Sequence, residues 1–452
     1  MIHQVNPSEK LVSNFYRLFK TLKIGQTLHA CGIRKFCGIS VIEVFGFLIS
    51  LVFTGKSLNR YLNSERGDIL PGKDTYYRFL NNNHYSWRKF LLTMAARVIG
   101  IFQTLTSSNR VRVFVLDDSV LSRNRSKKAE LLARVYDHSK GLFVKGYTLL
   151  TLGWSDGFSF VPVDFALLSS TKSVNRLVET NQNIDKRSCG YKRRKEAVEA
   201  KPQVASQLLD HAIATGILAD YVLMDTWFTN EPMISSIIDK GLDAIGMVKE
   251  LKQRYIINGK TYSLSQLRSF FKVKQGSEII GSICVQTKGK IPVKLVFVQN
   301  RNNHKEWLAI LSTDTTLEEH EIVRIYGMRW SIEVFFKSSK SLLKLGSEFQ
   351  GQSFDMRISH TSIVFTRYIL LEWERRCNQD ARSFGGLFYL FAEEVRDMDL
   401  KTALQSLMQY FIEIKKLVST KKAKNILSQV KDWIASQPSY IRCLLADFCC
   451  EV

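Results

Sequence analysis

Hydrophobic positions recur with two different spacings along the chain, and the change of spacing divides the chain into regions. Residues 1–105 carry apolar positions at helical spacing, and the most apolar of these stretches runs from Ile39 to Phe53. From about residue 106 the apolar runs become short and rich in Val, Ile, Leu and Phe, which indicates strands. Strands are predicted at 112–116, 147–153, 160–168, 221–224 and 243–248, with helices at 196–215 and 231–240.

The order of these elements, β-β-β-α-β-α-β, predicts the fold class. Three sequential antiparallel strands followed by α/β units give an α/β mixed sheet of the RNase H-like kind. Beyond it the pattern is mostly strand, then helical from Thr316 to Lys344, and helical again after Trp373. We therefore expect five parts: a helical DNA-binding domain (1–105), a first part of the catalytic domain (106–248), a β-rich insertion (249–312), a second part with the Glu333 helix (313–372) and a helical C-terminal region (373–452).

The charge balance narrows the class of partner. The chain has 64 Lys and Arg against 42 Asp and Glu, a formal net charge of +22. A protein this basic usually binds a polyanion, so nucleic acid or an anionic membrane is the candidate. The apolar run from Val44 to Phe53 is shorter than the roughly 20 residues that span a bilayer, so we expect no membrane association. The N-terminus lacks a signal-peptide pattern, and the eight cysteines include no C-x-x-C pair, which predicts a cytoplasmic protein with reduced thiols.

Acidic residues follow two of the predicted strands. Asp117 and Asp118 come after 112–116, and Asp225 comes directly after 221–224. Carboxylates at neighbouring strand ends can share a divalent metal ion, because hard cations prefer oxygen ligands.

A third acid lies on the predicted helix around Glu333. Tyr326, Arg329 and Lys340 stand at −7, −4 and +7 from it, and Lys337 stands at +4. Steps of 3, 4 and 7 residues keep side chains on one face of a helix. The opposite face carries apolar residues that would pack on the sheet, namely Ile332, Phe335 and Phe336. One carboxylate among several cations is a pattern that suits a metal ligand beside a DNA backbone.

The spacing Y-x2-R-x3-E-x6-K resembles the signature of bacterial insertion-sequence transposases of the DDE class, in the RNase H-like superfamily that includes retroviral integrases. The resemblance covers about residues 106–345. It implies that Asp118, Asp225 and Glu333 hold two Mg²⁺ ions, for which Mn²⁺ would substitute. It also implies DNA contacts by the residues Tyr326, Arg329 and Lys340, and base stacking by Trp307 at the end of the insertion.

The doubled acid leaves a choice between two neighbouring residues. Asp118 is preferred because Ser119 follows it, and the family usually has Asp followed by Ser or Thr. Side chains alternate along a strand, so Asp117 is expected on the other face.

Further DNA contacts are predicted in two places. A cluster between the third strand and the next helix, expected as a loop, holds six cations: Lys186, Arg187, Lys192, Arg193, Arg194 and Lys195. In the N-terminal region Asp74 is expected to cap a short helix that presents Arg78, as half of a helix-turn-helix.

The leading hypothesis is a transposase that acts on double-stranded DNA, binding the terminal inverted repeats of its own element and joining them to a target as a homodimer on paired ends. Residues 373–452 would provide the dimer contact, and the protein would lie on the bacterial nucleoid. Two alternatives stay open: an RNase H-like nuclease without strand transfer, and a domesticated DNA-binding protein whose active site is silent.

Overall fold

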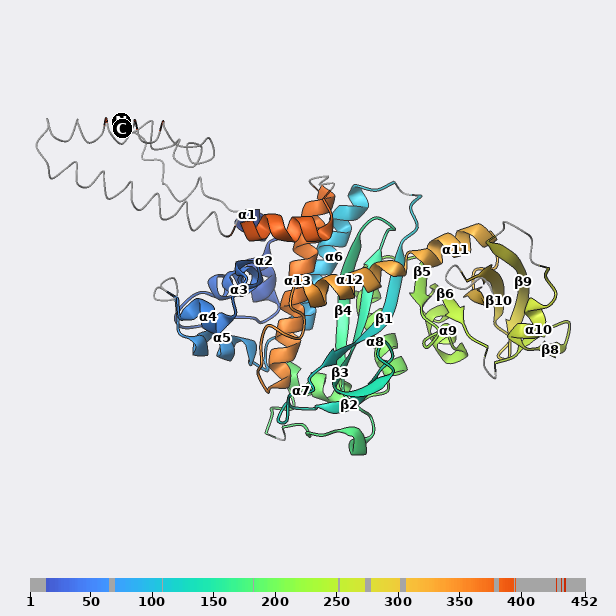
Figure 1. The fold of residues 1–452 in the computed structure, drawn as a ribbon, viewed down its shortest axis with the longest axis horizontal. Coiled ribbons are helices and arrows are strands. Elements are labelled where there is room, and N and C mark those ends of the chain that lie inside the picture. Colours follow the sequence, from blue (N-terminus) through green and yellow to red (C-terminus); the bar gives the residue numbers. More distant parts are fainter. Residues whose placement is uncertain are drawn as a thin grey trace, which may run out of the picture.

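The computed structural model describes residues 14–377, with gaps at 65–69, 108, 182, 251–252, 273–277 and 301–305, then 382–393 and the single residues 395, 428, 432 and 435. In this part of the chain, helices pack against one long mixed sheet (Figure 1). The strands are β1 (Val113–Ser122), β2 (Ala133–Asp137), β3 (Leu142–Ser155), β4 (Phe160–Leu168), β5 (Tyr221–Met224), β6 (Asp243–Val248), β7 (Tyr255–Ile257), β8 (Lys260–Tyr262), β9 (Ile279–Thr287), β10 (Pro292–Gln299) and β11 (Trp307–Ser312).

The helices surround the sheet and form the whole of the N-terminal region. They are α1 (Asn14–Thr21), α2 (Ile24–Ala30), α3 (Val41–Ser50), α4 (Leu58–Leu62), α5 (Lys73–Leu80), α6 (Trp87–Thr104), α7 (Cys189–Glu196), α8 (Lys201–Ala214), α9 (Glu231–Ile238), α10 (Leu264–Arg268), α11 (Glu319–Gly327), α12 (Trp330–Ser341) and α13 (Phe354–Cys377).

The central part of the sheet has the predicted RNase H-like order. β3 pairs antiparallel with both β1 and β4, while β5 pairs parallel with β1 and β6 parallel with β5. In the turn between β3 and β4, Gly157 adopts the positive φ of 82° that favours glycine. In the central part of the sheet, the sequence pattern does not reveal β2, because its buried positions are Ala133, Val135 and Asp137, of which only Val135 is a strong strand former. It pairs with the first part of β3.

The β-rich insertion continues the same sheet. β11 pairs antiparallel with β6, so that Ala309 lies opposite Val248, and β10, β9, β7 and β8 follow in that order. These strands form the right-hand end of the molecule in Figure 1. Long-range pairing of this kind joins the insertion to the catalytic sheet through backbone hydrogen bonds.

The N-terminal region is helical, as predicted, and has an aromatic core. Phe45 of α3 packs against Trp87 and Phe90 of α6 at ring distances of 6.1 and 5.4 Å. Helix α3 begins with a capping box in which Ser40 and Glu43 satisfy each other's backbone N–H groups. The expected cap at Asp74 is wrong. α5 begins at Lys73 after Gly72, so Asp74 lies in its first turn.

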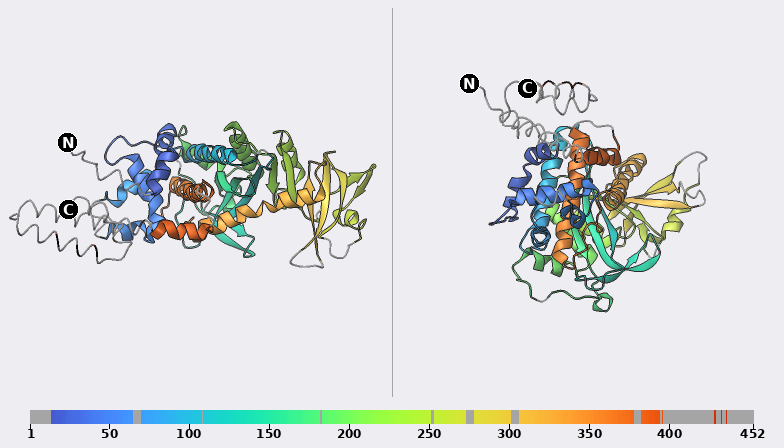
Figure 2. Two further views of the ribbon diagram at one scale, coloured as in Figure 1. Left: turned by 90° about the horizontal axis from the view of Figure 1, so that it is seen from above. Right: turned by 60° about the vertical axis from the view of Figure 1, so that its left-hand side comes forward.

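Helix α13 lies between the N-terminal helices and the sheet (Figures 1 and 2). It contacts α3, α5 and α6 as well as β4. Residues 354–372 of this helix are all buried, and Phe365 packs against Phe165 of β4 at 5.2 Å. The helix therefore forms the common core of the N-terminal and catalytic regions.

The C-terminal region falls largely outside the described residues, which end, apart from single positions, at residue 393. Its apolar run packs internally: Leu387, Phe388 and Phe391 are buried, and Phe53 contacts both phenylalanines. Tyr389 of the same run is exposed, and the dimer contact predicted for residues 373–452 stays a prediction. No helix among the described residues is long and apolar enough to cross a bilayer.

Candidate active site

Strand register brings two of the predicted acids together. Leu116 of β1 lies beside Met224 of β5 in a parallel pair, so the next residues along, Asp117 and Asp225, follow on the same side. β5 ends before its acid, as predicted, but β1 continues to Ser122 and pairs with β3 along its whole length. Asp117 and Asp118 therefore lie within β1, where successive side chains point to opposite faces of the sheet.

The Glu333 helix covers the face of β1 that carries Asp117. Arg329 donates from Nη1 to Oδ2 of Asp117 at 3.0 Å and from Nη2 to Oε1 of Glu333. Two residues further along β1, Ser119 Oγ accepts a hydrogen bond from Lys340 Nζ at 2.6 Å. The apolar side of α12 is buried as predicted, at Ile332, Phe335 and Phe336. These contacts hold Glu333 above Asp117 and Ser119.

Asp118 points to the other side of the strand. Its carboxylate bonds to Lys201 at the start of α8, and the Lys201 ammonium also lies 3.7 Å from the ring centre of Trp227. Arg329 thus joins Asp117, and not Asp118, to Glu333, although both acids line the same groove. The assignment of Asp118 as a metal ligand stays a prediction. Lys201 is a residue that the sequence does not single out, because a lone lysine before a proline carries no recognisable pattern.

The acids and their cations create an unusual electrostatic environment. Burial raises the pKa of Asp117 to about 7, and the neighbouring charges of Asp225 and Asp118 add to this shift while Arg329 opposes it. Burial likewise raises the pKa of Tyr326 to about 12. A carboxyl whose pKa is raised by burial and by neighbouring charges marks a candidate functional site.

The three carboxylates have the chemistry of a divalent metal site, and the guanidinium of Arg329 lies between two of them. Asp117, Asp225 and Glu333 supply the carboxylate oxygens that Mg²⁺ prefers. Within the described ranges, no three His, Cys, Asp or Glu side chains are grouped closely enough to hold an ion. Arg329 lies between Asp117 and Glu333 and forms an ion pair with each of them.

A groove of about 780 Å³ opens beside these residues. Both acids of β1 line it, together with Glu333, Lys201 and Lys340. The groove is thus an acidic centre with cations at its edge, an arrangement suited to a phosphate backbone approaching bound metal ions.

The Tyr326-to-Lys340 stripe is divided between two helices. α11 ends at Gly327 and α12 begins at Trp330, and the turn between them is tightened by bonds from the N–H of Met328 to Ile325 and of Arg329 to Tyr326. The two helices run nearly end to end in Figure 1. The predicted single helix is therefore interrupted at Arg329, although the residues stay on one side. Lys337 is exposed.

The expected basic loop is mostly helix α7, and one of its cations is unavailable. Arg194 is only 6% exposed and bonds to both carboxylate oxygens of Glu130 and of Asp355. The prediction that Arg194 contacts DNA is thus wrong, because two acids distant in sequence already neutralise it. Arg193 is bonded to Glu196.

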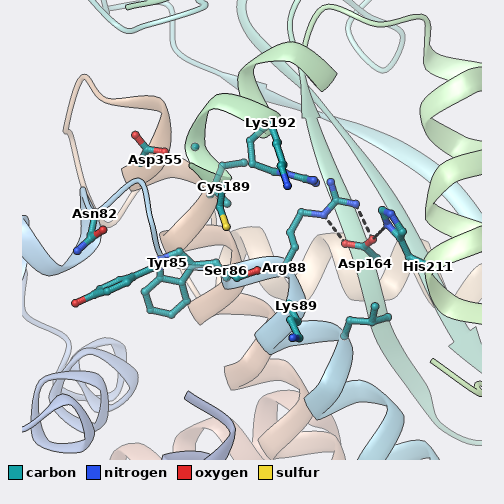
Figure 3. Close-up of a pocket in the computed structure, with 15 residues that line it drawn as sticks. Asn82, Tyr85, Ser86, Arg88, Lys89, Asp164, Cys189, Lys192, His211 and Asp355 are labelled. Atoms are coloured by element: carbon teal, nitrogen blue, oxygen red, sulfur yellow. Dashed lines mark hydrogen bonds and ion pairs between the residues drawn. The ribbon is translucent and has the colours of Figure 1, made fainter. Parts of the chain in front are cut away.

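The remaining cations of the cluster face solvent. Lys186, Arg187, Lys192 and Lys195 are exposed, with Arg187 paired to Asp185. Lys192 borders a cavity of about 330 Å³ whose lining Figure 3 displays. A buried ionic network forms part of its wall: Arg88 bonds to Asp164 and Glu196, and His211 lies on Asp164.

The last two candidates lie apart from the groove. Arg78 is exposed on α5, where its Nε donates to Asp74 O at 3.3 Å. Trp307, the first residue of β11, is half-buried and packs against Phe297 at 5.7 Å. The partly exposed Trp227 lies closer to the acids, because it follows Asp225 and donates its N–H to that carboxylate at 3.0 Å.

Comparison with known families agrees with this geometry. Residues 54–257 match the model of a DDE superfamily endonuclease, and residues 190–355 match that of a transposase DDE domain. Over these residues the chain is similar to DDE superfamily endonucleases and transposases, and each of the two matches spans less than half of the chain.

Among individual proteins, the chain is similar to the transposase for insertion sequence element IS1151 of Clostridium perfringens. The two are 24% identical over 237 residues, which make up 47% of each. The chain thus aligns with about half the length of that relative. A solved structure, the Drosophila P element transposase strand transfer complex, aligns at 11% identity with 84% of this chain and 69% of its own. Its TM-score of 0.23 is too low to support an argument about fold.

Proposed function

We propose that this protein is a DNA transposase that binds the terminal inverted repeats of its insertion sequence and carries out metal-dependent strand cleavage and strand transfer, in a cut-and-paste reaction. The observation that carries the proposal is the parallel register that sets Asp117 beside Asp225 beneath the Glu333 helix. The matches to DDE family models and the net charge of +22 support it.

In this proposal Asp117, Asp225 and Glu333 hold two Mg²⁺ ions, with Mn²⁺ as a substitute. Such ions lower the pKa of a bound water or hydroxyl and stabilise the leaving oxygen of an in-line displacement. Arg329 balances the charge of Asp117 and Glu333 in the free protein. The phosphates next to the reacting bond would be bound by Tyr326, Arg329, Lys337 and Lys340.

The partners follow from the reaction. Cut-and-paste transfer needs two element ends in one assembly, so we propose a homodimer on paired ends of double-stranded DNA, acting on the nucleoid in the cytoplasm. Trp227 and Trp307 are the candidates for stacking on an unpaired base, and Trp227 is the nearer of the two to Asp225.

The direct test is incubation of the purified protein with the DNA that flanks its own gene and with Mg²⁺, followed by sequencing of all new ends. A transposase produces 3′ ends at the element boundary that become joined to target DNA. Cleaved ends that never join would instead identify a nuclease, and intact DNA under all conditions would contradict both.

Salt dependence tests the polyanion partner. With about 6–10 phosphate contacts, affinity for duplex DNA should fall roughly 10³- to 10⁵-fold between 50 and 200 mM salt. Replacing the exposed Lys186, Lys192 and Lys195 with Gln should weaken binding on any sequence and reduce the slope of log affinity against log salt by up to about 2.7, since each lost contact accounts for about 0.9. Fluorescence anisotropy measures this slope, and an unchanged slope would remove α7 from the DNA-binding surface.

A further inference from the structure

A second, strongly basic cavity adjoins the catalytic groove. It has a volume of about 860 Å³ and lies between the connection from β1 to β2 and the connection from α12 to α13. Five of its twelve lining residues are basic: Arg123, Arg125, Lys127, Lys128 and Arg357. Among these lining residues, all of which the structure describes, none is acidic.

The innermost of these cations is buried without an acidic partner. Arg357, in the first turns of α13, is 9% exposed and donates from Nη2 to Gly351 O at 3.0 Å. Its buried Nε–H has no hydrogen-bond partner in the described part of the chain. Arg123 donates only to a carbonyl, Phe349 O, at 3.2 Å. In the ranges that the structure describes, neither guanidinium forms an ion pair.

Other buried arginines of this protein are neutralised. Arg88, Arg194 and Arg367 are each bonded to at least one buried carboxylate. Arg123 and Arg357 instead lie near each other. Burial, and next the charge of Arg357, lower the pKa of Arg123 to about 10. Two like charges with unfilled donors reduce the stability of the free protein, so their placement calls for an anionic ligand.

We propose that Arg123 and Arg357 form a binding site for a backbone phosphate of the DNA substrate, with Arg125, Lys127 and Lys128 at its rim. The proposal rests on the proposed function and extends it to a site that lies apart from the carboxylates. The cavity shares Ser122, Gly346 and Ser347 with the catalytic groove, so one DNA strand can run through both.

The strand geometry sets the position of the bound phosphate. Five residues of β1 separate Asp117 from Ser122, which is about 17 Å at roughly 3.4 Å per residue. Phosphates on one strand of a duplex follow at about 3.4 Å along the helix axis. Because the backbone also winds around that axis, successive phosphates lie further apart than the rise, and the phosphate held by Arg123 and Arg357 should lie fewer than about five nucleotides from the bond that is cut.

Binding measurements on Arg123→Gln, Arg357→Gln and the double variant test the site. The double variant should bind duplex DNA at least tenfold more weakly and lose about 0.9 from the salt slope, because one phosphate contact is removed. Its Tm should stay close to that of the parent, because relief of the repulsion offsets loss of the bonds to Gly351 and Phe349 and of the contact between Arg357 and the Tyr147 ring. Arg324→Gln is the matched control, since this exposed guanidinium is already paired with Glu321.

A neutral methylphosphonate, placed at one position at a time along the strand, locates the contact. At one position within a few nucleotides of the cleaved bond it should weaken binding of the parent about as much as the double substitution does, and should weaken binding of the double variant no further. Equal affinity and slope for parent and double variant would overturn the site, as would a lowered Tm with unchanged binding. A parent protein that shows no salt-dependent DNA binding would instead overturn the proposed function itself.

Discussion

Replacing Asp117 with Asn, Asp225 with Asn or Glu333 with Gln is expected to abolish strand cleavage in Mg²⁺, whereas Asp118→Asn should retain it. An amide of the same size cannot supply the charge that a metal ligand needs. Loss of one ligand charge removes several kcal/mol of transition-state stabilisation, and each ~1.4 kcal/mol is a factor of ten in rate. The three variants should therefore lose about a thousandfold or more in rate.

DNA binding separates loss of chemistry from loss of fold. The three variants should bind duplex DNA at least as tightly as the parent, because a negative charge near the phosphates has been removed. Asp118→Asn is the matched control: it lies next to Asp117 on the same strand and is bonded to Lys201 on the opposite side. If Asp118→Asn proved inactive and Asp117→Asn active, the assignment of strand faces would be reversed, and near-parental cleavage by Glu333→Gln would contradict the three-carboxylate site.

The sequence located three acidic positions but did not show which member of the doubled pair bonds to Arg329 beside Glu333. Short apolar runs located β1 and β5, and helical spacing located Glu333. The choice between Asp117 and Asp118 depends on the register between β1 and β5, where Leu116 meets Met224. The register between two strands about a hundred residues apart cannot be read from the sequence of either strand. The preference for Asp118 was based instead on the Ser119 that follows it.

The basic cluster shows a different limit of sequence patterns. A run of like charges has the same appearance whether its members face solvent or acids from elsewhere in the chain. Arg194 is neutralised by Glu130 and Asp355, each more than 60 residues away. Burial of one arginine among exposed lysines can be recognised only once the connection from β1 to β2, α7 and α13 are packed together. The basic segment 123–128, by contrast, can be recognised from the sequence, because basic residues are dense there shortly after the acids of β1.

The junction between the N-terminal and catalytic regions depends on another buried arginine. Arg367 of α13 is fully buried and donates to Glu348 through Nη1 at 2.8 Å and Nη2 at 3.0 Å. It also donates to the carbonyls of Leu48 and Ile49 at the end of α3. His360 completes the cluster, with Nε2 3.1 Å from Glu348. A single guanidinium thus ties α3 to α13.

Glu348→Gln should destabilise the protein by about 3–5 kcal/mol, because it leaves the charge of Arg367 buried without a carboxylate. Urea unfolding followed by tryptophan fluorescence measures the shift in midpoint. Glu321→Gln, which breaks the exposed pair with Arg324, is the control and should change stability by at most about 1 kcal/mol. Similar midpoints for the two variants would show that the buried cluster contributes little.

The same cluster predicts how stability depends on pH. Burial opposes ionisation of Glu348, but Arg367 and His360 outweigh it and lower its pKa to about 2 from an ordinary value near 4.5. Its contribution is therefore complete above pH 4.5 and is lost as pH falls from 4.5 towards 2. Burial lowers the pKa of His360, so the unfolded chain takes up a proton near pH 6.5 that the folded protein resists. Both groups make the parent less stable as pH falls. In Glu348→Gln, the decline in stability between pH 4.5 and 2 should be lost, while the decline that begins near pH 6.5 should remain. Unfolding midpoints measured from pH 7 down to the lowest pH at which the protein stays folded would separate the two contributions.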